Sequence, residues 1–223
     1  PGLSPEVLAR YEAMFRGTFY RRFVLGEWAA AEGLVYDFFG PELVQPVPES
    51  LDGPWYISCD YGTVNPTSMG LWGQKGGVWY RTAEFYYDSR KTGRQQTDGE
   101  YADDLARLAG GRDIRGVVLD PSAASFREEL IRRGWMVYRA ENEVLSGIRR
   151  TAELLRAGQL VICSPCEDAI REFGLYRWDT AATGDRVVKE HDHAMDDIRY
   201  FAVTVAGRRS EGFFAGAVER GGG

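Results

Sequence analysis

The sequence has little cysteine, lysine and histidine. Among its 223 residues are three cysteines, two histidines and three lysines, so 24 of the 27 basic residues are arginine. Three unevenly spaced cysteines are too few for a disulfide framework and indicate a reducing compartment. No apolar run approaches the ~18–20 residues that cross a bilayer, and no signal-peptide pattern opens the chain. We therefore expect no membrane association and no disulfide-stapled fold.

The composition is that of an ordinary folded domain. Hydrophobic residues make up 44% and aromatic residues 13% of the chain, which is too apolar for a disordered protein. The formal net charge of -6 argues at first against a nucleic-acid partner. Arginine, however, offers a planar fork that suits phosphate, and seven arginines face five glutamates between residues 125 and 156. That surplus is compatible with a phosphate-facing edge, with solvated helix faces, or with codon usage in a GC-rich genome.

The positions of the prolines and of a predicted helix start divide the chain into three segments. Ser4 and Pro5 have the pattern of a helix start, and four prolines mark a linker between residues 40 and 54. No repeat is visible, and no phosphate loop of the Gly-x-x-x-x-Gly-Lys-Ser/Thr type is present. The expected division is a linker region at 1–50, one folded domain at 51–207 and a flexible tail at 208–223.

From residue 55 onward the pattern predicts an α/β fold. A buried strand at 55–60 is followed by two antiparallel strands within 67–87, and strands then alternate with helices. We expect a mixed central sheet, three antiparallel strands followed by parallel strands, with helices on both faces. The later strands are predicted at 116–120, 135–140 and 159–163, and the helices at 97–109, 122–133, 146–158, 164–178 and 190–205.

Two of these strands end in an aspartate. Asp60 ends "YISCD", and Asp120 ends "GVVLD". The carboxyl ends of strands are where open α/β sheets build their sites, although aspartate before glycine or proline also simply forms turns. The two strands can be sheet neighbours, which would bring both carboxylates together.

A third acidic group lies on the last predicted helix, in "KEHDHAMDDIRYFAV". His193 and Asp196 are three residues apart and share a helix face, and Asp197 follows directly. Converging carboxylates repel one another unless a cation neutralises them, and oxygen-rich sites favour Mg²⁺ or Mn²⁺. Paired ions of this kind suit phosphodiester hydrolysis. The alternative is a charged helix start, which explains Asp192 better than Asp196.

Two other motifs have simpler explanations. Cys163 and Cys166 flank Ser164 and Pro165, and with Glu167 the segment reads as a capped helix start without zinc. "DYGTVNPTS" resembles the first phosphate loop of the actin and Hsp70 ATPases, but a second such loop and a second lobe are missing from the sequence.

Four segments taken in order resemble one protein family. "FYRRFVLGEWAAAEGLVYDFF", "DYGTVNPTS", "VVLDPSAASF" and "KEHDHAMDDIRYFA" look like successive landmarks of the nuclease region of tailed-phage terminase large subunits. The resemblance implies a ribonuclease H-like fold and a metal-dependent endonuclease that cuts concatemeric double-stranded DNA with little sequence specificity. It also implies that the segment before residue 55 is the end of an ATPase region, whose core and activity are absent from this chain.

The resemblance assigns roles to individual residues. Asp60, Asp120 and Asp196 match the acids that hold two Mg²⁺ or Mn²⁺ ions, with Asp197 a close competitor to Asp196, and His193 matches a histidine one turn earlier. The implied partners are the ATPase domain, the small terminase subunit and the portal protein, in the host-cell cytoplasm, with the isolated domain monomeric. Candidate contacts to the DNA backbone are Lys189, Arg127, Arg132, Arg149 and Arg150.

Two alternative functions remain open at this point. A resolvase or transposase would use the same core on branched DNA or in strand transfer, although "GEWAAAEG" does not fit that family. A non-catalytic module would bind DNA or the portal while cleavage happens elsewhere.

Overall fold

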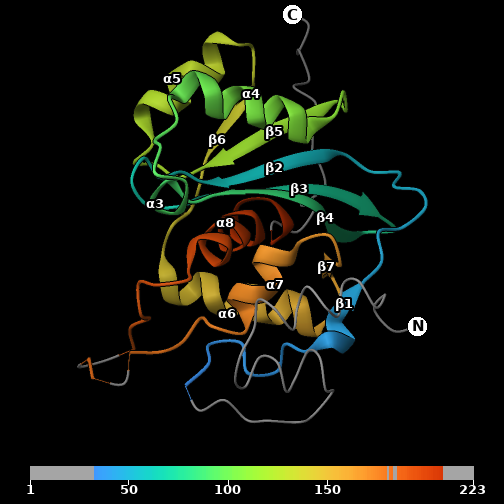
Figure 1. The fold of residues 1–223 in the computed structure, drawn as a ribbon. Coiled ribbons are helices and arrows are strands. Elements are labelled where there is room, and N and C mark those ends of the chain that lie inside the picture. Colours follow the sequence, from blue (N-terminus) through green and yellow to red (C-terminus); the bar gives the residue numbers. More distant parts are fainter. Residues whose placement is uncertain (1–32, 180, 183–184, 208–223) are drawn as a thin grey trace, which may run out of the picture.

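The computed structural model describes residues 33–179, 181–182 and 185–207. The predicted helix that starts at Ser4 and the predicted tail at 208–223 lie outside this part. A seven-stranded mixed sheet, in the order β1-β7-β4-β3-β2-β5-β6, forms the centre of the fold (Figure 1). Its strands are β1 (Val44–Gln45), β2 (Trp55–Asp60), β3 (Thr67–Lys75), β4 (Val78–Tyr87), β5 (Ile114–Leu119), β6 (Val137–Arg139) and β7 (Leu160–Cys163).

The three long strands form the predicted antiparallel meander. β2 pairs with β3 and β3 with β4, both antiparallel, while β5, β6, β7 and β1 add in parallel. Gly76 and Gly77 turn the β3–β4 hairpin with φ of +56° and +82°, a backbone region that glycine enters without steric cost. The predicted mixed α/β sheet is confirmed, including the adjacency of the strands that end near Asp60 and Asp120.

Helices cover both faces of the sheet, as predicted (Figure 1). α4 and α5 lie on one face, and α6, α7 and α8 lie on the other. The helices are α3 (Ser89–Thr92), α4 (Asp98–Ala109), α5 (Ala124–Arg132), α6 (Val144–Arg156), α7 (Glu167–Phe173) and α8 (His193–Phe201), with a 3-10 turn at Pro41–Leu43 and a π-helical turn at Ala202–Ala206. Within the described residues, no helix is long and apolar enough to cross a membrane.

Several boundaries differ from the sequence expectation. The last helix begins at His193 rather than at residue 190, and its final turn is π-helical. α7 begins at Glu167 with Cys166 as its N-cap residue, and that residue makes no side-chain cap hydrogen bond. The expected capping box of Ser164 and Glu167 is therefore wrong. Glu84 of β4 takes over the capping role, as described below.

The sheet separates two apolar cores. Met69 and Leu71 of β3 pack with Tyr101, Leu105 and Phe126 of α4 and α5. On the other face, side chains of α6, α7 and α8 pack around Trp72, whose ring stacks on Phe201 of α8 at 4.1 Å between centroids. Residues ahead of the predicted linker join this second core, because Phe39 stacks on Phe173 of α7 at 3.8 Å. The expected division of the chain at residue 50 stays a prediction.

Candidate functional site

Strand register brings two acidic residues together. β2 and β5 are parallel neighbours in which Cys59 pairs with Leu119. The next residues are Asp60 and Asp120, so both leave the sheet at the same edge from strands about 4.8 Å apart. Asp120 then makes a tight turn, in which its carboxylate accepts hydrogen bonds from the backbone N–H (3.3 Å) and hydroxyl of Ser122.

The spacing of alternate side chains along β2 matches the spacing of every fourth side chain along α8. Alternate β2 residues Tyr56, Ser58 and Asp60 face the helix, and they meet Phe201, Asp197 and His193, which are four residues apart. Two residues of a strand advance about 6.6 Å and four residues of a helix about 6.0 Å. The two elements therefore stay in step over three successive contacts. The last contact places His193 Nδ1 2.9 Å from Asp60 Oδ2.

The middle contact of this series buries Asp197 completely. Its carboxylate accepts hydrogen bonds from Ser58 Oγ at 2.8 Å, from Ser68 Oγ, and from both terminal nitrogens of Arg81, Nη2 at 3.0 Å. Both side chains of the Arg81–Asp197 ion pair are 0% exposed. Glycine at position 70 is required here, because a Cβ would lie 2.0 Å from Arg81 Nη1. Asp197 thus fastens α8 to three strands of the sheet.

Asp196 points elsewhere, because one helical residue turns the side chain by about 100°. Its carboxylate accepts from Arg199 Nη2 at 2.9 Å and from Lys189 Nζ at 3.3 Å. Arg199 is 2% exposed and runs between α6 and α8. Only glycine at position 147 leaves it room, since a Cβ there would lie 2.6 Å and 2.7 Å from Arg199 Cγ and Cδ.

Two buried glutamates cap the helices that carry the site. Neither α7 nor α8 has a side-chain cap from its own N-cap residue. Glu84 of β4 accepts the backbone N–H groups of Asp168 (2.6 Å) and Ala169 (3.2 Å) at the start of α7. Glu172 of α7 accepts the N–H of Ala194 at 2.7 Å at the start of α8. Sheet, α7 and α8 are therefore linked in series, and the series ends beside His193.

Crowding of acids perturbs the groups around Asp60. Burial raises the pKa of Asp60 to about 7, the charge of Asp196 adds to the rise, and the hydrogen bond to His193 opposes it. Burial alone would lower the pKa of His193. The hydrogen bond and charge of Asp60 outweigh that effect, so the pKa of His193 lies above its ordinary value. The two side chains form one proton-sharing pair.

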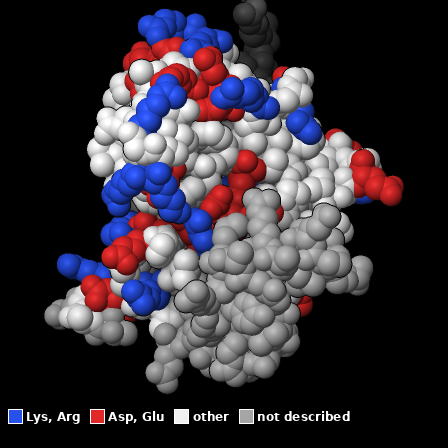
Figure 2. Space-filling model, in the orientation of Figure 1, with Lys and Arg blue, Asp and Glu red and all other residues white. Residues whose placement is uncertain are grey.

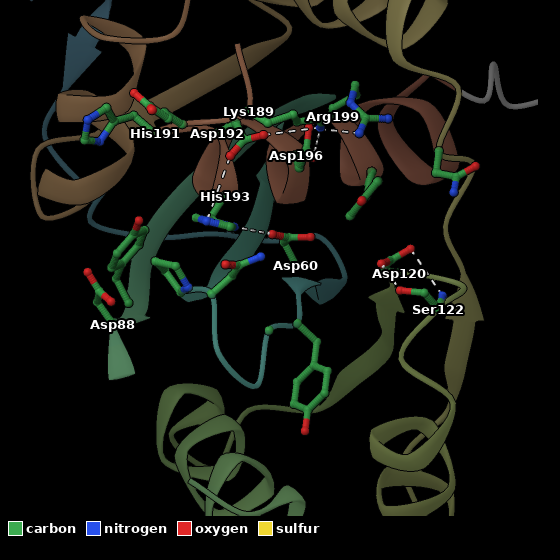
Figure 3. Close-up of a pocket in the computed structure, with 18 of the residues that line it drawn as sticks. Asp60, Asp88, Asp120, Ser122, Lys189, His191, Asp192, His193, Asp196 and Arg199 are labelled. Atoms are coloured by element: carbon green, nitrogen blue, oxygen red, sulfur yellow. Dashed lines mark hydrogen bonds and ion pairs between the residues drawn. The ribbon is translucent and has the colours of Figure 1, made fainter. Parts of the chain in front are cut away.

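These side chains line a groove of about 880 Å³. In Figure 2, Lys and Arg side chains gather along the edge of the molecule beside α3, and acidic side chains lie among them. Figure 3 shows Asp60 and His193 in the middle of the groove, Asp120 and Ser122 on one side, and Asp88 and His191 on the other. Six acidic and five basic residues line it: Asp60, Asp88, Asp120, Glu190, Asp192, Asp196, Arg90, Lys91, Arg171, Lys189 and Arg199.

A comparison with solved structures finds a protein that is similar to this chain. The chain is 43% identical to the large terminase of the thermophilic bacteriophage D6E, solved in complex with ADP, with a TM-score of 0.75. The chain is related to phage large terminases. The alignment covers 91% of the chain and 52% of the D6E protein, so the chain spans about half the length of that terminase.

Two more distant structures share the fold of this chain. The nuclease domain of the P22 large terminase is 17% identical, with a TM-score of 0.63 over 79% of the chain and 94% of that domain. The large terminase nuclease of the thermophilic phage G20c, solved with bound magnesium, is 17% identical, with a TM-score of 0.57 over 78% and 98%. Both likenesses concern the fold, which is that of terminase nuclease domains. No family model and no curated protein matches the chain.

The structure separates the residues that sequence reasoning had grouped. Asp60, Asp120, Asp196, His193 and Lys189 line the groove, and Asp197 does not. Four predicted DNA contacts also lie outside its lining: Arg127 and Arg132 on α5, and Arg149 and Arg150 on α6. These helices cover opposite faces of the sheet (Figure 1). Sequence reasoning missed the basic residues that line the groove, Arg90, Lys91, Arg171 and Arg199.

The donor set suits a hard cation, although the carboxylates are not yet gathered around a single point. In the described ranges, no three or more His, Cys, Asp or Glu side chains stand close enough to hold a metal ion. The three candidate ligands among the groove aspartates, Asp60, Asp120 and Asp196, nevertheless offer only oxygen ligands, as Mg²⁺ and Mn²⁺ prefer. A cationic group already lies beside two of the groove acids, because Lys189 Nζ is 3.2 Å from Asp192 and 3.3 Å from Asp196.

Proposed function

We propose that this terminase chain is a metal-dependent endonuclease domain that cuts concatemeric double-stranded DNA with little sequence specificity. The observation that carries the proposal is the convergence of Asp60, Asp120 and Asp196 on one groove from three separate elements. The related G20c nuclease was solved with bound magnesium, which supports a divalent cation here. Endonuclease activity and the two-ion requirement are both part of the proposal.

Asp60, Asp120 and Asp196 are the proposed ligands of two Mg²⁺ or Mn²⁺ ions, with Asp60 contributing to both. Asp197 is left out of the proposed set because its two oxygens accept four hydrogen bonds inside the protein. When bound, such ions supply a nucleophilic hydroxide and stabilise the departing oxygen of the cleaved strand. Asp120 is the ligand that can most easily reorient, since within the described residues its carboxylate accepts hydrogen bonds from Ser122 in its own turn.

The other groove residues would hold the ligands and the substrate. His193 orients the Asp60 carboxylate through its hydrogen bond, and it can take up or release a proton beside it. Arg199 fixes Asp196 from the buried side, which leaves the other carboxylate oxygen for Lys189 or for a cation. Lys189 is 61% exposed and would turn from Asp196 toward a DNA phosphate.

The wider assembly is proposed by analogy, because the chain spans about half the length of the D6E terminase. The expected partners are the ATPase domain, the small terminase subunit and the portal protein. The expected setting is the host-cell cytoplasm, where DNA is packaged.

Plasmid cleavage tests the proposed activity. Supercoiled DNA should be nicked and linearised with Mn²⁺ or Mg²⁺, and EDTA should stop the reaction. Asp60→Asn should reduce the rate by at least about 10²-fold, because it removes the ligand shared by both ions. Asp103→Asn is a matched control, since Asp103 is an exposed acid on α4 paired with Arg133. Undiminished cleavage by Asp60→Asn would refute the proposed metal site.

Two results would replace the proposal. Preference for branched DNA, or strand transfer, would indicate a resolvase or transposase. DNA or portal binding without metal-dependent nicking, in the chain and in a full-length terminase that carries it, would indicate a docking module.

A further inference from the structure

The groove continues past the acidic centre to a basic end. Arg90 and Lys91 on α3 line this part together with Arg171 of α7. Three segments far apart in sequence thus contribute, since His191 lines the same end. Figure 3 places His191, and Asp88 at the start of α3, on the side of Asp60 opposite to Asp120.

Arg171 is built into the groove wall. Its guanidinium carbon lies 5.0 Å from the ring centroid of Tyr86, and its side chain is only 16% exposed. Asp168 at 2.7 Å and Glu172 at 3.6 Å hold it in place. Its Nε is buried and has no hydrogen-bond partner within the described chain, so contact with an incoming anion would fall to the terminal nitrogens.

The two α3 residues are held loosely and carry little compensation. Arg90 Nη2 donates to the side-chain oxygen of Asn65, a neutral group. Lys91 is 70% exposed, and its ion pair with Asp88 is long at 3.8 Å. Exposed pairs of this kind contribute little, so both cations are available to an incoming anion.

The surroundings of His191 indicate a net positive field at this end. Burial lowers the pKa of His191, and the charges of Arg171, Lys91 and Arg177 lower it further against the opposing charge of Glu190. His191 is also the one non-glycine residue of the described chain with a positive φ, at +54°. A left-handed conformation in such a residue is uncommon and marks a locally constrained loop.

We infer that Arg90, Lys91 and Arg171 form a phosphate-binding site that holds the DNA backbone on the His193 side of the metal centre. The inference rests on the proposed nuclease function and adds to it which surface carries the duplex. Backbone contact of this kind gives affinity and orientation without reading sequence. The site anchors phosphates that are not being cleaved, because Asp60 lies in the middle of the groove and Asp120 lies on the side away from Asp88 and His191.

Binding of a fluorescent duplex by the whole chain tests this. Ca²⁺ replaces Mg²⁺ so that DNA stays intact, and affinity is measured over a salt series. Arg90→Gln combined with Lys91→Gln should weaken binding roughly tenfold and lower the slope of log affinity against log salt by about one per lost contact. Arg107→Gln with Arg115→Gln is the matched control, because both arginines are exposed and lie outside the groove lining. The Mg²⁺ affinity of the double variant without DNA should equal that of wild type.

The outcomes separate this inference from the proposed function. Wild-type affinity and salt slope in the Arg90/Lys91 variant, with DNA cleavage intact, would overturn the phosphate site and leave the nuclease assignment in place. An equal loss in the control variant would show a non-specific effect of net charge and would also overturn it. Loss of cleavage by Asp60→Asn with unaltered DNA binding would support both assignments. A wild-type chain that binds no duplex would overturn both.

Discussion

Asp196 and Asp197 are adjacent in sequence, but substitution of Asp197 should mainly reduce stability, whereas substitution of Asp196 should mainly reduce metal binding. Asp197 is 0% exposed and pairs with the equally buried Arg81. Asp197→Asn would leave that guanidinium with Glu84, at 3.4 Å, as its one charged partner among the described residues. Breaking a buried ion pair by removing one partner costs about 3–5 kcal/mol. For a domain of this size, that corresponds to a fall in melting temperature of roughly 6–20 °C.

Asp196→Asn should destabilise the protein less than Asp197→Asn. Its carboxylate lies in the groove near Asp60 and Asp192, and its charge contributes to the raised pKa of Asp60. Removing the charge relieves that repulsion while it weakens the contacts with Lys189 and with Arg199, which is 2% exposed. Because the two effects oppose each other, we expect a net loss below the value of about 3–5 kcal/mol for a broken buried pair.

Thermal melting with and without Mg²⁺ separates the two roles. Wild type should be stabilised by Mg²⁺, because a ligand that binds only the folded state raises its stability by mass action. Asp196→Asn should melt above Asp197→Asn and lose the Mg²⁺ shift. Asp197→Asn should melt much lower and keep the shift. If Asp197→Asn instead melted like wild type and no longer responded to Mg²⁺, the assignment of the two acids would be reversed.

Two further substitutions test the supporting structure. Burial raises the pKa of Glu84 from 4.5 to about 7, so between these pH values the folded protein binds more protons than the unfolded one. The free energy of unfolding therefore falls by about 3 kcal/mol as pH rises through this window. Glu84→Gln should flatten this pH dependence, measured by denaturant titrations across the window. Gly147→Ala should lower stability by about 1–3 kcal/mol and weaken Mg²⁺ binding, because the new Cβ displaces Arg199. Gly99→Ala in α4 is the control and should be neutral or stabilising, because the nearest atom there is Arg133 Nη2 at 3.4 Å. Equal effects from both variants would refute the steric argument.

The strand ends were predictable because their signal is local. Apolar runs that stop at Asp60 and at Asp120 mark strands and their carboxyl ends. The sequence allowed β2 and β5 to be neighbours, and the structure pairs them in parallel. Helix bounds were less certain, since the start of α8 depends on a carboxylate from Glu172, twenty-two residues earlier in the chain. Such a distant cap leaves no sequence pattern.

The rotation of α8 was not predictable from its own sequence. Helical periodicity fixes which residues share a face, but the alignment of His193 and Asp197 with β2 decides which of two consecutive acids enters the core. The burial of Arg81 was not predictable from the sequence either, because an arginine in a strand is normally expected to face solvent. Its burial requires a glycine next to the guanidinium, Gly70, and a buried acid, Asp197. Only the packed structure shows the three together.

The arginine bias of the composition acquires a second explanation from these pairs. Arginine suits phosphate binding, yet Arg81 and Arg199 are almost fully buried and each holds one aspartate of α8. Asp60 is matched in the same way by His193. Because each acid near the centre has its own internal partner, the fold can gather these carboxylates without relying on bound cations to cancel their repulsion. The proposed ions would then bind to a scaffold already assembled, unlike metal sites whose occupation drives folding. The exposed cations of α3 remain free to meet the substrate.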